Sequence, residues 1–409
     1  MHIVVHGALA EINVDQWNAL LPSNNPFMRY EFLHGLETSR CVSQERGWEP
    51  AHVAIYEDKS AQKLLAAMPA YIKTHSYGEY IFDWAWADAH HRHGLDYYPK
   101  LSNAVPFTPA TGERWLVSEH MDSELAIKLL VATFMQLTEE REISSIHSLF
   151  TSEEQAQQLG RHDFLIRHSS QFHWQNKNYD DFDDFLAGMN SKKRKNIKRE
   201  RRRVKESGIR YRWLTGSQLD ENAVDQMYAF YKRTIAMYGA QSYLNKPFFD
   251  YLADSFSQQT LFLFADYCGP LSADNIAEPD NNHQESNGTN QRQVIAGGLY
   301  FKSDNAHNNT LYGRYWGALD NFHSVHFETC YYQAIDWCIQ NGFHRFEAGA
   351  QGEHKLARGL EPSITYSAHW IKDQQFHKAI DEFLQDEQNR VSRYTDVMQQ
   401  HSPFKNVEL

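Results

Sequence analysis

The sequence predicts an α/β protein built from two similar modules in tandem, the first at residues 1–175 and the second at 176–409. The chain has 409 residues, which at about 150 residues per domain suggests two domains. Hydrophobic residues make up 42% of the chain and aromatic residues 14%, enough for sizeable cores. The order of strands and helices expected in the first half also recurs roughly in the second, although no repeat is visible residue by residue.

The elements of the first module follow from apolar patterns and turn residues. Residues 52–56 and 63–73 are expected to be strands joined by the polar turn 57–60. Apolar residues at helical spacing predict a helix at 124–140, and the prolines and glycine within 99–112 predict a rigid, irregular loop. The other expected elements are a strand and a helix start in 1–20, a helix at 26–37, a helix near 90–94, strands at 115–117 and 144–150, a helix at 152–159 and a last segment at 164–174.

The second module is expected to begin with a helix at 182–205, for which Gly208 is a plausible stop. Residues 269–292 are rich in Asn, Asp, Ser, Pro and Gly, so we expect a flexible insertion between strands there. The remaining predictions are strands at 209–214, 261–266, 294–302, 310–316, 344–348 and 365–371, and helices at 220–237, 247–256, 326–341 and from 376 onward.

Several protein classes are disfavoured by composition. No apolar run approaches the roughly 20 residues that a transmembrane helix needs. The first residues carry no basic leader followed by a long apolar region, so no signal peptide is expected. Four scattered cysteines without a Cys-x-x-Cys pair indicate neither a zinc site nor a disulfide framework, so we expect no metal and a reduced, cytoplasmic compartment.

Charge is spread unevenly along the chain. The net charge is −12, yet residues 192–205 hold ten basic residues and one acid, for +9, which leaves about −21 for the rest, the difference between the two values. Basic residues surround most of the predicted helix at 190–206, and Ile197 and Val204 form its thin apolar seam. The helix could be a solvated connection between modules. It could also contact a phosphate-rich ligand such as a nucleotide, tRNA or lipid headgroups.

The segment Ser76–Asp88 combines three carboxylates with five large aromatic residues. Read as a strand, it directs alternate side chains to opposite faces. One face would carry Tyr80, Phe82, Trp84 and Trp86, and the other Glu79 and Asp83 with Ile81 and Ala85. Carboxylates beside aromatic rings indicate a pocket for a polar ligand. The alternative is an ordinary half-buried strand with a solvated acidic face.

A second candidate site is the loop Gly349–Gly359, which follows a predicted strand. Its glycines let the backbone turn tightly, and Glu353 and His354 could move protons near neutral pH. Lys355 and Arg358 could hold a phosphate or a carboxylate. The alternative is a charged surface loop with glycine turns.

The third candidate is Tyr312–Gly317, a predicted strand that runs toward the helix starting near His326. A strand, a glycine and a helix N-terminus in this order can bind a pyrophosphate, although lone glycines are weak evidence. Ser324, His326 and Glu328 could simply be caps, and Cys330 is expected in the core. The sequence contains no Walker loop, no His-Glu-x-x-His and no Gly-x-Ser-x-Gly.

Several longer motifs are distributed along the chain. They are Asn25-Pro26-Phe27, Ala67-Met68-Pro69, Tyr71–Tyr80, Phe82–Ala87, Tyr98-Pro99-Lys100-Leu101, Val105–Pro109 with Gly112, and Gly349–Lys355 with Arg358-Gly359. Together they resemble the FemAB-like family of predicted bacterial N-acyltransferases, formerly a domain of unknown function labelled for peptidoglycan biosynthesis or recognition. The resemblance covers about residues 25–390, and the segment 269–292 looks like an insertion relative to the family.

This resemblance implies two tandem GNAT-like modules of the Fem type, each with a mixed, largely antiparallel sheet flanked by helices. It implies transfer of an acyl or aminoacyl group from acyl-CoA or aminoacyl-tRNA to a small-molecule amine, with a cell-envelope precursor as one acceptor. No tightly bound cofactor is expected, with acyl-CoA as a donor substrate. The sequence lacks a clear Arg/Gln-x-x-Gly-x-Gly/Ala loop, which weighs against acetyl-CoA. The basic stretch 192–205 resembles one ahead of the second module in Fem proteins.

Direct attack of an amine on an ester or thioester needs a base and a group that stabilises the oxyanion. Glu79, Asp83, Glu347 and His354 are candidate bases, and a backbone N–H near Gly317 could bind the carbonyl. The expected catalytic residues are Asp83, Glu353 and His354; the expected substrate-binding residues are Glu79, Trp84, Trp86, Lys100, Thr108, Arg314, Tyr315, Trp316, Gln351, Lys355 and Arg358; and the expected donor-binding glycines are Gly317, Gly349 and Gly352. The alternatives are a non-catalytic protein that recognises peptidoglycan or another ligand and a structural partner of a cell-envelope complex.

Overall fold

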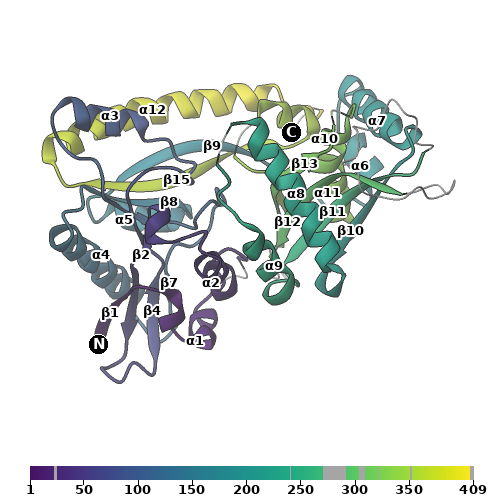
Figure 1. Ribbon diagram of the computed structural model, residues 1–409. Helices are drawn as coiled ribbons and strands as arrows, with labels where there is room; N and C mark the ends of the chain where they lie inside the picture. Colours follow the sequence, from purple (N-terminus) through teal and green to yellow (C-terminus); the bar gives the residue numbers. More distant parts are fainter. Residues whose placement is uncertain are drawn as a thin grey trace.

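The computed structural model describes residues 1–22, 25–239, 241–269, 292–303, 309–320, 322–350 and 352–405. Its strands form one long sheet and one small sheet, with helices on both sides (Figure 1). The small sheet belongs to the first module and pairs its strands in the order β1 (His2–His6), β3 (His52–Tyr56), β4 (Leu64–Met68) and β7 (Leu116–Val117).

The long sheet runs through both modules. Its strands are antiparallel to their neighbours except at two places, β13 beside β14 and β6 beside β8, which are parallel. The order is β10 (Ile209–Thr215), β11 (Thr260–Tyr267), β12 (Gln293–Lys302), β13 (Thr310–Ala318), β14 (Arg345–Glu347), β9 (Leu165–Gln175), β15 (Glu361–Ile371), β8 (Ser145–Thr151), β6 (Lys100–Asn103), β5 (Tyr71–Lys73) and β2 (Trp48–Pro50). The expected mixed, largely antiparallel architecture is confirmed.

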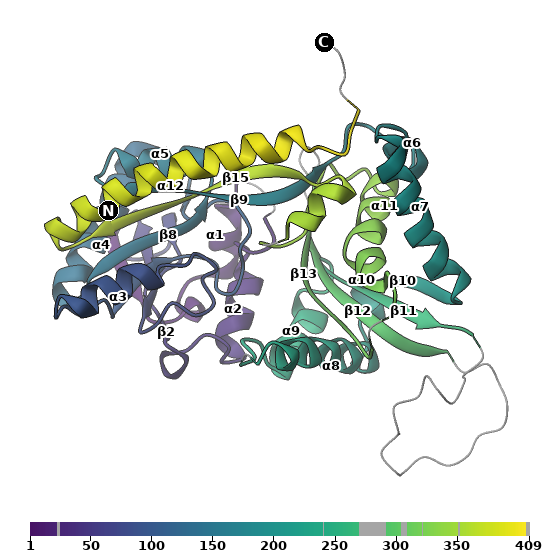
Figure 2. The same ribbon diagram turned by 90° about the horizontal axis from the view of Figure 1, so that it is seen from above.

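The two modules exchange strands at the centre of this sheet. β15, from the end of the chain, lies between β8 and β9, and β9 lies between β15 and β14. The β9–β15 ladder extends from Glu361 opposite His173 to His369 opposite Leu165. The last helix, α12 (Gln374–Gln400), packs along this pair (Figure 2). The sheet is therefore continuous across the predicted module boundary at residue 175, which stays a prediction.

Helices cover the sheets on both sides, and side chains cap several of them. The carboxylate of Asp122 accepts from Leu125 N, and the Asn190 side chain accepts from Lys193 N. The helices of the first half are α1 (Val14–Ala19), α2 (Tyr30–Thr38), α3 (Trp84–Arg92), α4 (Ser123–Glu140) and α5 (Glu153–Gly160). Those of the second half before α12 are α6 (Phe182–Ala187), α7 (Ser191–Glu206), α8 (Glu221–Met237), α9 (Lys246–Ser255), α10 (Val325–Phe327), the π-helical turn η5 (Glu328–Tyr332) and α11 (Gln333–Gln340). Short 3₁₀ turns are η1 (Leu9–Glu11), η2 (Gln44–Arg46), η3 (Gly216–Gln218) and η6 (Glu353–Arg358).

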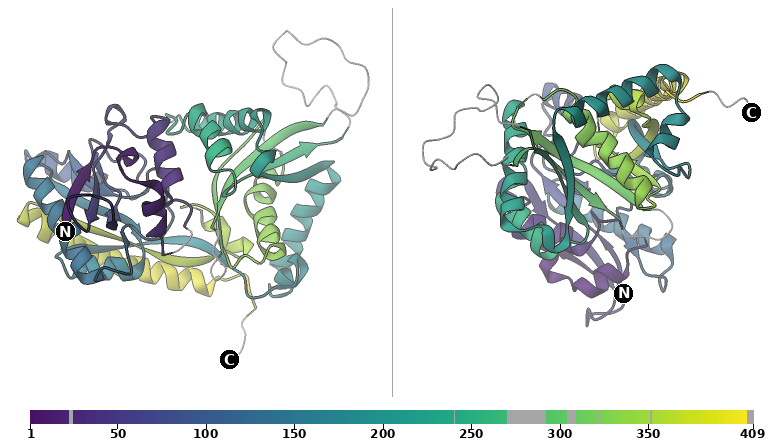
Figure 3. Two further views of the ribbon diagram at one scale, coloured as in Figure 1. Left: turned by 90° about the horizontal axis from the view of Figure 1, so that it is seen from below. Right: turned by 90° about the vertical axis from the view of Figure 1, so that its right-hand side faces the viewer.

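The first half of the chain (purple to blue in Figure 3) lies beside the second (teal to green), and an aromatic core joins the two halves. Phe27, just before α2, packs edge-on against Phe301 of β12 and Tyr312 of β13, with ring centroids 5.4 and 4.9 Å apart. Phe32 of α2 lies 5.8 Å from Phe248 of α9. Each such contact adds to the burial of large rings, so the halves stabilise each other directly.

Three predictions of local structure are wrong. The segment 76–88 is a loop followed by α3, because Gly78 and Tyr80 adopt left-handed backbone angles (φ +84° and +60°) that end any strand. The helix expected near 90–94 is present as the end of α3, which begins earlier, at Trp84, and ends at Arg92. The strand expected at 63–73 divides at Pro69 into β4 and β5, which belong to different sheets, since proline cannot donate to a ladder. The helix expected at 182–205 divides where Asn190 caps α7.

The flexible insertion predicted at 269–292 lies almost wholly outside the described residues. Within the parts of the chain that are described, we find no helix both long enough and apolar enough to cross a membrane.

Candidate active site

The parallel strands β13 and β14 open a gap in the sheet of the second module. They pair only from Thr310 opposite Arg345 to Tyr312 opposite Glu347, where β14 ends. Beyond Tyr312, β13 continues to Ala318, and over this stretch its only partner among the described strands is β12. A register shift in that ladder makes Arg314 the extra residue of a bulge, which bends β13 away. Backbone groups of β13 therefore face the gap without a partner strand.

A small cavity of about 110 Å³ fills this gap. The turn η5 forms one wall of the cavity, and its wider π-helical geometry is a feature that often accompanies functional sites. The lining residues are Tyr300, Gly313, Arg314, Tyr315, Trp316, His326, Cys330, Tyr331, Ala348 and Lys355. The charged residues among them are Arg314 and Lys355, and none is an acid, so the cavity is electropositive.

Lys355 is the charged group that burial affects most here. Its side chain is 2% exposed, and its ammonium donates to the Gly349 carbonyl at 2.7 Å. It forms no ion pair with any carboxylate in the described part of the chain. Burial lowers the pKa of Lys355 to about 8. A buried cation without a counter-ion is costly, and an anion or developing oxyanion in the cavity would offset that cost.

Two histidines stand beside this lysine. Burial, together with the nearby His354, Arg358 and Lys355, lowers the pKa of His326 to about 4, so its ring is neutral at pH 7 and can accept a proton. His354 is exposed at the rim, where its Nε2 lies 2.8 Å from the Tyr331 hydroxyl. Burial also lowers the pKa of His354.

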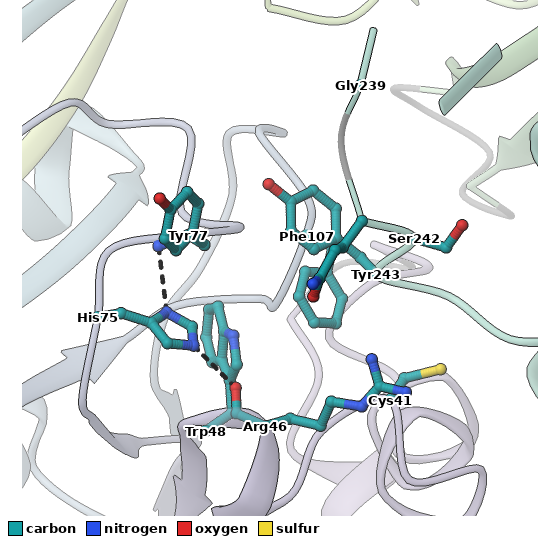
Figure 4. Close-up of a pocket in the computed structure, with 10 residues that line it drawn as sticks. Cys41, Arg46, Trp48, His75, Tyr77, Phe107, Gly239, Ser242 and Tyr243 are labelled. Carbon is teal, nitrogen blue, oxygen red and sulfur yellow. Dashed lines mark hydrogen bonds between the residues drawn. The ribbon is translucent and has the colours of Figure 1, made fainter. Parts of the chain in front are cut away.

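A larger cavity of about 510 Å³ lies between the modules (Figure 4). The first module contributes one wall, and the loop between α8 and α9 contributes the other. Phe107 and Tyr243 stack across the boundary with ring centroids 5.0 Å apart. The lining residues are Cys41, Arg46, Trp48, His75, Tyr77, Phe107, Gly239, Gln241, Ser242 and Tyr243. A volume of this size suits a small-molecule ligand, and the aromatic walls suit a flat or cyclic one.

Arg314 connects the two cavities. Its backbone lines the small cavity, and its guanidinium donates to the carbonyl of Phe107 in the wall of the larger one. Tyr80, from the loop before α3, interacts with Tyr315. Burial raises the pKa of the Tyr315 hydroxyl, and Tyr80 raises it further. Residues from both modules therefore meet where the two cavities adjoin.

The structure places several expected site residues at the small cavity. Arg314, Tyr315, Trp316 and Lys355 line it. Arg358 stacks on Phe327, 3.4 Å from the ring centroid, and donates to the His354 carbonyl, so it supports the rim. Gly349 and Gly352 have left-handed φ angles of +81° and +118°, which favour glycine. Gln351 lies outside the described residues.

Other expected residues lie elsewhere. Glu353 is exposed and accepts a hydrogen bond from Tyr394 of α12 at 3.1 Å. Glu347 is buried at the end of β14, where it pairs with Arg345, and burial raises its pKa. Thr108 is buried in its loop and donates to the Pro106 carbonyl. Trp86 is buried, whereas Trp84 lies on the surface with its ring 5.1 Å from Tyr77.

Glu79, Asp83 and Lys100 form a buried ionic cluster in the first module. The Lys100 ammonium donates to Glu79 at 2.7 Å and also to Asp83. Tyr97 donates to Asp83 at 2.6 Å, and Ser76 accepts from Lys100 at 2.7 Å. Burial tends to raise the pKa of Asp83, but the charge and hydrogen bond of Lys100 lower it. The net result is a pKa well below the usual range of an aspartate. The chain's own Lys100, expected to bind substrate, thus occupies the position between the carboxylates where a polar ligand was expected.

Sequence reasoning missed several cavity residues. His326 was interpreted as a possible helix cap, and Tyr331 was noted beside Cys330 but given no place in the predicted site, because a π-helical turn cannot be recognised from apolar spacing. The residues of the larger cavity also gave no signal in the sequence, since they come together only when the modules pack. They include Arg46, Trp48, His75 and Tyr243. The one available hint was the stretch Gly239–Tyr243, a polar connection between two predicted helices.

Gly317 offers a test of how close β13 lies to α8. A Cβ added there would lie 2.2 Å from the backbone oxygen of Phe230. We expect Gly317→Ala to push α8 off the sheet and to lower the free energy of unfolding by about 1–3 kcal/mol or more. Urea denaturation measures this, with Gly160→Ala as the control, because its added Cβ meets nothing closer than 3.6 Å. Equal midpoints for the two variants would contradict the packing. The expected donor-binding role of Gly317 stays a prediction.

Buried neutral histidines should make stability depend on pH. Burial, followed by the cations Arg345 and Lys355, holds the pKa of His173 well below 6.5. The unfolded chain then binds a proton that the folded chain does not, so this contribution is complete above about pH 6.5 and is lost as pH falls, by up to about 1.4 kcal/mol per unit. We expect His173→Gln, which retains a donor toward Gln171, to show a shallower loss of unfolding free energy between about pH 7 and pH 5. Identical slopes would contradict this.

Comparison with solved structures defines the class of protein first. FemX aligns with a TM-score of 0.53 at 9% identity over 93% of this chain and 100% of its own. The C-terminal domain of a putative lysylphosphatidylglycerol synthetase from Agrobacterium fabrum aligns with a TM-score of 0.51 at 8% identity over 91% of this chain and 96% of its own. At this identity the likeness concerns the fold, which is the tandem GNAT-like arrangement of Fem-type transferases.

A family model gives the more specific assignment. The FemAB-like model, described as peptidoglycan biosynthesis/recognition, matches residues 8–277 and 285–406. The chain therefore belongs to the FemAB-like family. A comparison with curated proteins finds no match.

Proposed function

We propose that this protein is an N-acyltransferase that moves an acyl or aminoacyl group from an ester or thioester donor to an amine. The observation that carries the proposal is the gap between β13 and β14, with backbone groups of β13 that have no partner strand on one side and the buried ammonium of Lys355 on the other. Acyl transfer through a tetrahedral intermediate needs donors of this kind around a developing oxyanion.

The donor carbonyl would lie in the small cavity. The amine nitrogen attacks the carbonyl carbon, the C–O or C–S bond to the leaving group breaks, and the leaving oxygen or sulfur takes up a proton. Lys355 and a backbone N–H of the bulged strand stabilise the oxyanion between these two events. The volume of about 110 Å³ favours a small transferred group over a long acyl chain.

His326 is the base that this arrangement favours. It lines the cavity and is unprotonated at pH 7, at the cost of the weaker basicity that its lowered pKa brings. The rim residue His354 is exposed, and the Asp83 carboxylate is held in an ion pair with Lys100. His326 would take the proton that the attacking amine loses. His354, hydrogen-bonded to Tyr331, would pass protons between the cavity and solvent.

The acceptor would occupy the larger cavity between the modules. Trp48, Tyr77, Phe107 and Tyr243 offer flat apolar faces, and Arg46 at the rim offers a positive charge. A cyclic or sugar-like group that carries an anion suits this lining, and a cell-envelope precursor with a free amine has that chemistry. Arg314, between the cavities, would keep the donor and the acceptor aligned with each other.

The basic helix α7 would contact a phosphate-bearing part of the donor. Its apolar residues Ile197 and Val204 are buried, so its outer surface is almost wholly cationic. Arg201 is engaged internally with Glu328 and Asp336, and Glu200 reaches Arg358 at the cavity rim. The exposed cations are Lys192, Lys195, Lys198, Arg199, Arg202, Arg203 and Lys205.

The test is product formation by the purified protein. Aminoacyl-tRNA and short acyl-CoA donors are incubated separately with amine acceptors, and the acylated amine is measured by mass spectrometry. We expect product with at least one donor and a loss of about 10²–10⁴-fold in His326→Ala. Glu353→Gln should retain activity, because the Glu353 side chain is exposed, bonds to Tyr394 and does not line the cavity. Full turnover by His326→Ala would exclude it as the base.

Recognition without catalysis is the second candidate, because the acceptor cavity is well formed independently of the small one. Thermal stabilisation by a muropeptide, with no product from any donor, would favour recognition over transfer.

A further inference from the structure

The most exposed apolar side chains gather at the mouth of the cavity between the modules. Met237 and Tyr238 are 79% and 80% exposed, more than any other large hydrophobic residue of the described chain. Across from them, Tyr77 is 58% exposed and the neighbouring Trp84 is 42% exposed. Scattered single apolar residues are ordinary on a protein surface, but a cluster on two sides of one opening is not.

These residues form two lips. The first lip comprises Tyr77, which lines the cavity, and Trp84, whose ring lies 5.1 Å from that of Tyr77. The second lip comprises Met237 and Tyr238, which directly precede the cavity residue Gly239. Figure 4 shows Tyr77 and Gly239 on opposite sides of the cavity. The lips therefore come from different modules and border the same opening.

Folding does not explain the second lip. The buried face of α8 consists of Ala223, Val224, Met227, Phe230 and Tyr231, all earlier in the helix. Met237 and Tyr238 follow it at the helix end and contribute little to any core. Exposed apolar surface of this kind gains free energy only when a partner covers it.

The charges nearby indicate what that partner is. Lys232 and Arg233 are exposed one turn before the second lip, and Arg46 is exposed at the rim beside the first. Tryptophan and tyrosine combined with lysine and arginine favour the boundary between lipid headgroups and acyl chains, where rings enter and cations meet phosphates.

We propose that the two lips dock this face of the protein onto an anionic lipid surface, so that the cavity between the modules opens onto the lipid headgroups. The rings and the Met237 side chain enter the headgroup region, and Arg46, Lys232 and Arg233 contact lipid phosphates. The attachment is peripheral and uses loops rather than a helix. An acceptor held at a lipid surface would then reach the cavity without leaving that surface.

Flotation of the full-length protein with vesicles tests this without any turnover. We expect binding to phosphatidylcholine vesicles that contain phosphatidylglycerol, and weaker binding to phosphatidylcholine alone. The lip variant combines Tyr77→Ser, Trp84→Ser, Met237→Ser and Tyr238→Ser, and should lose at least about tenfold in partition coefficient. The control combines four exposed apolar residues on α1, α4 and α12, outside the lips, as Val14→Ser, Leu125→Ser, Phe383→Ser and Val397→Ser, and should bind like the wild type.

Further measurements separate the outcomes. Lys232→Gln with Arg233→Gln should remove only the part of binding that depends on phosphatidylglycerol. Both quadruple variants should unfold at the wild-type temperature, since all eight side chains are exposed. The proposal is overturned if the wild type floats with neither vesicle, or if the lip and control variants lose binding equally. It is also overturned if the lips instead mediate a concentration-dependent dimer that the lip variant abolishes.

Discussion

Lys355→Met is expected to lower the rate of acyl transfer by about 10²–10³-fold, the usual effect of removing one oxyanion donor. Lys355 is the buried cation of the small cavity and carries no counter-ion among the described residues. Single-turnover measurement with a saturating donor separates this loss from weaker donor binding. Because burial lowers the pKa of Lys355 to about 8, the ammonium is present below that pH and activity should fall as pH rises through it.

Two controls distinguish this role from a structural one. Lys128→Met removes an exposed lysine of α4 and should leave single-turnover chemistry unchanged. Lys355→Met itself should unfold at or above the wild-type denaturant midpoint, because loss of an unpaired buried cation removes an unfavourable term. Normal turnover by a folded Lys355→Met protein would exclude the lysine from the chemical step.

Lys100→Met is expected to lower the free energy of unfolding by about 3–5 kcal/mol, because it leaves two buried carboxylates without their counter-ion. The lysine and both acids, Glu79 and Asp83, are almost wholly buried, and one oxygen of each acid already lacks a hydrogen-bond partner among the described residues. Equilibrium denaturation with urea at pH 7 measures the change.

A compensated variant shows whether the cluster is structural. Glu79→Gln and Asp83→Asn combined with Lys100→Met remove all three charges together, and we expect them to recover much of the lost stability. If that triple variant is folded and active, Asp83 is not needed as a base. If it is folded and inactive, the cluster contributes to catalysis, as the expected role of Asp83 requires. A Lys100→Met protein as stable as the wild type would contradict the ion pairing.

Much of the fold could be predicted from local patterns. The apolar spacing of 124–140 and of 220–237 predicted α4 and α8 closely, since a helix buries one face whatever it packs against. The loop Gly349–Gly359 was predicted from residue types alone, and Lys355 lines the cavity there.

The segment 76–88 shows where local patterns fail. Alternation of acids and aromatic rings is compatible with a strand, but the left-handed backbone at Gly78 and Tyr80 breaks it. The partner of the acids, Lys100, is 17 residues from Asp83 and 21 from Glu79 in sequence, and no local rule connects them. A pattern that predicted an open ligand pocket therefore marks a closed ionic cluster.

The sequence by itself determined the class of fold, most helices and strands, and the residue types of the loop beside the cavity, because these depend on the period of apolar residues and on turn chemistry. Only the tertiary structure decided which groups share a site. The exchange of β9 and β15, the opening of β13 from β14 and the packing of the α8–α9 loop against the first module each join residues far apart in the chain. Such contacts arise from the packing of whole surfaces, which no short stretch of sequence encodes.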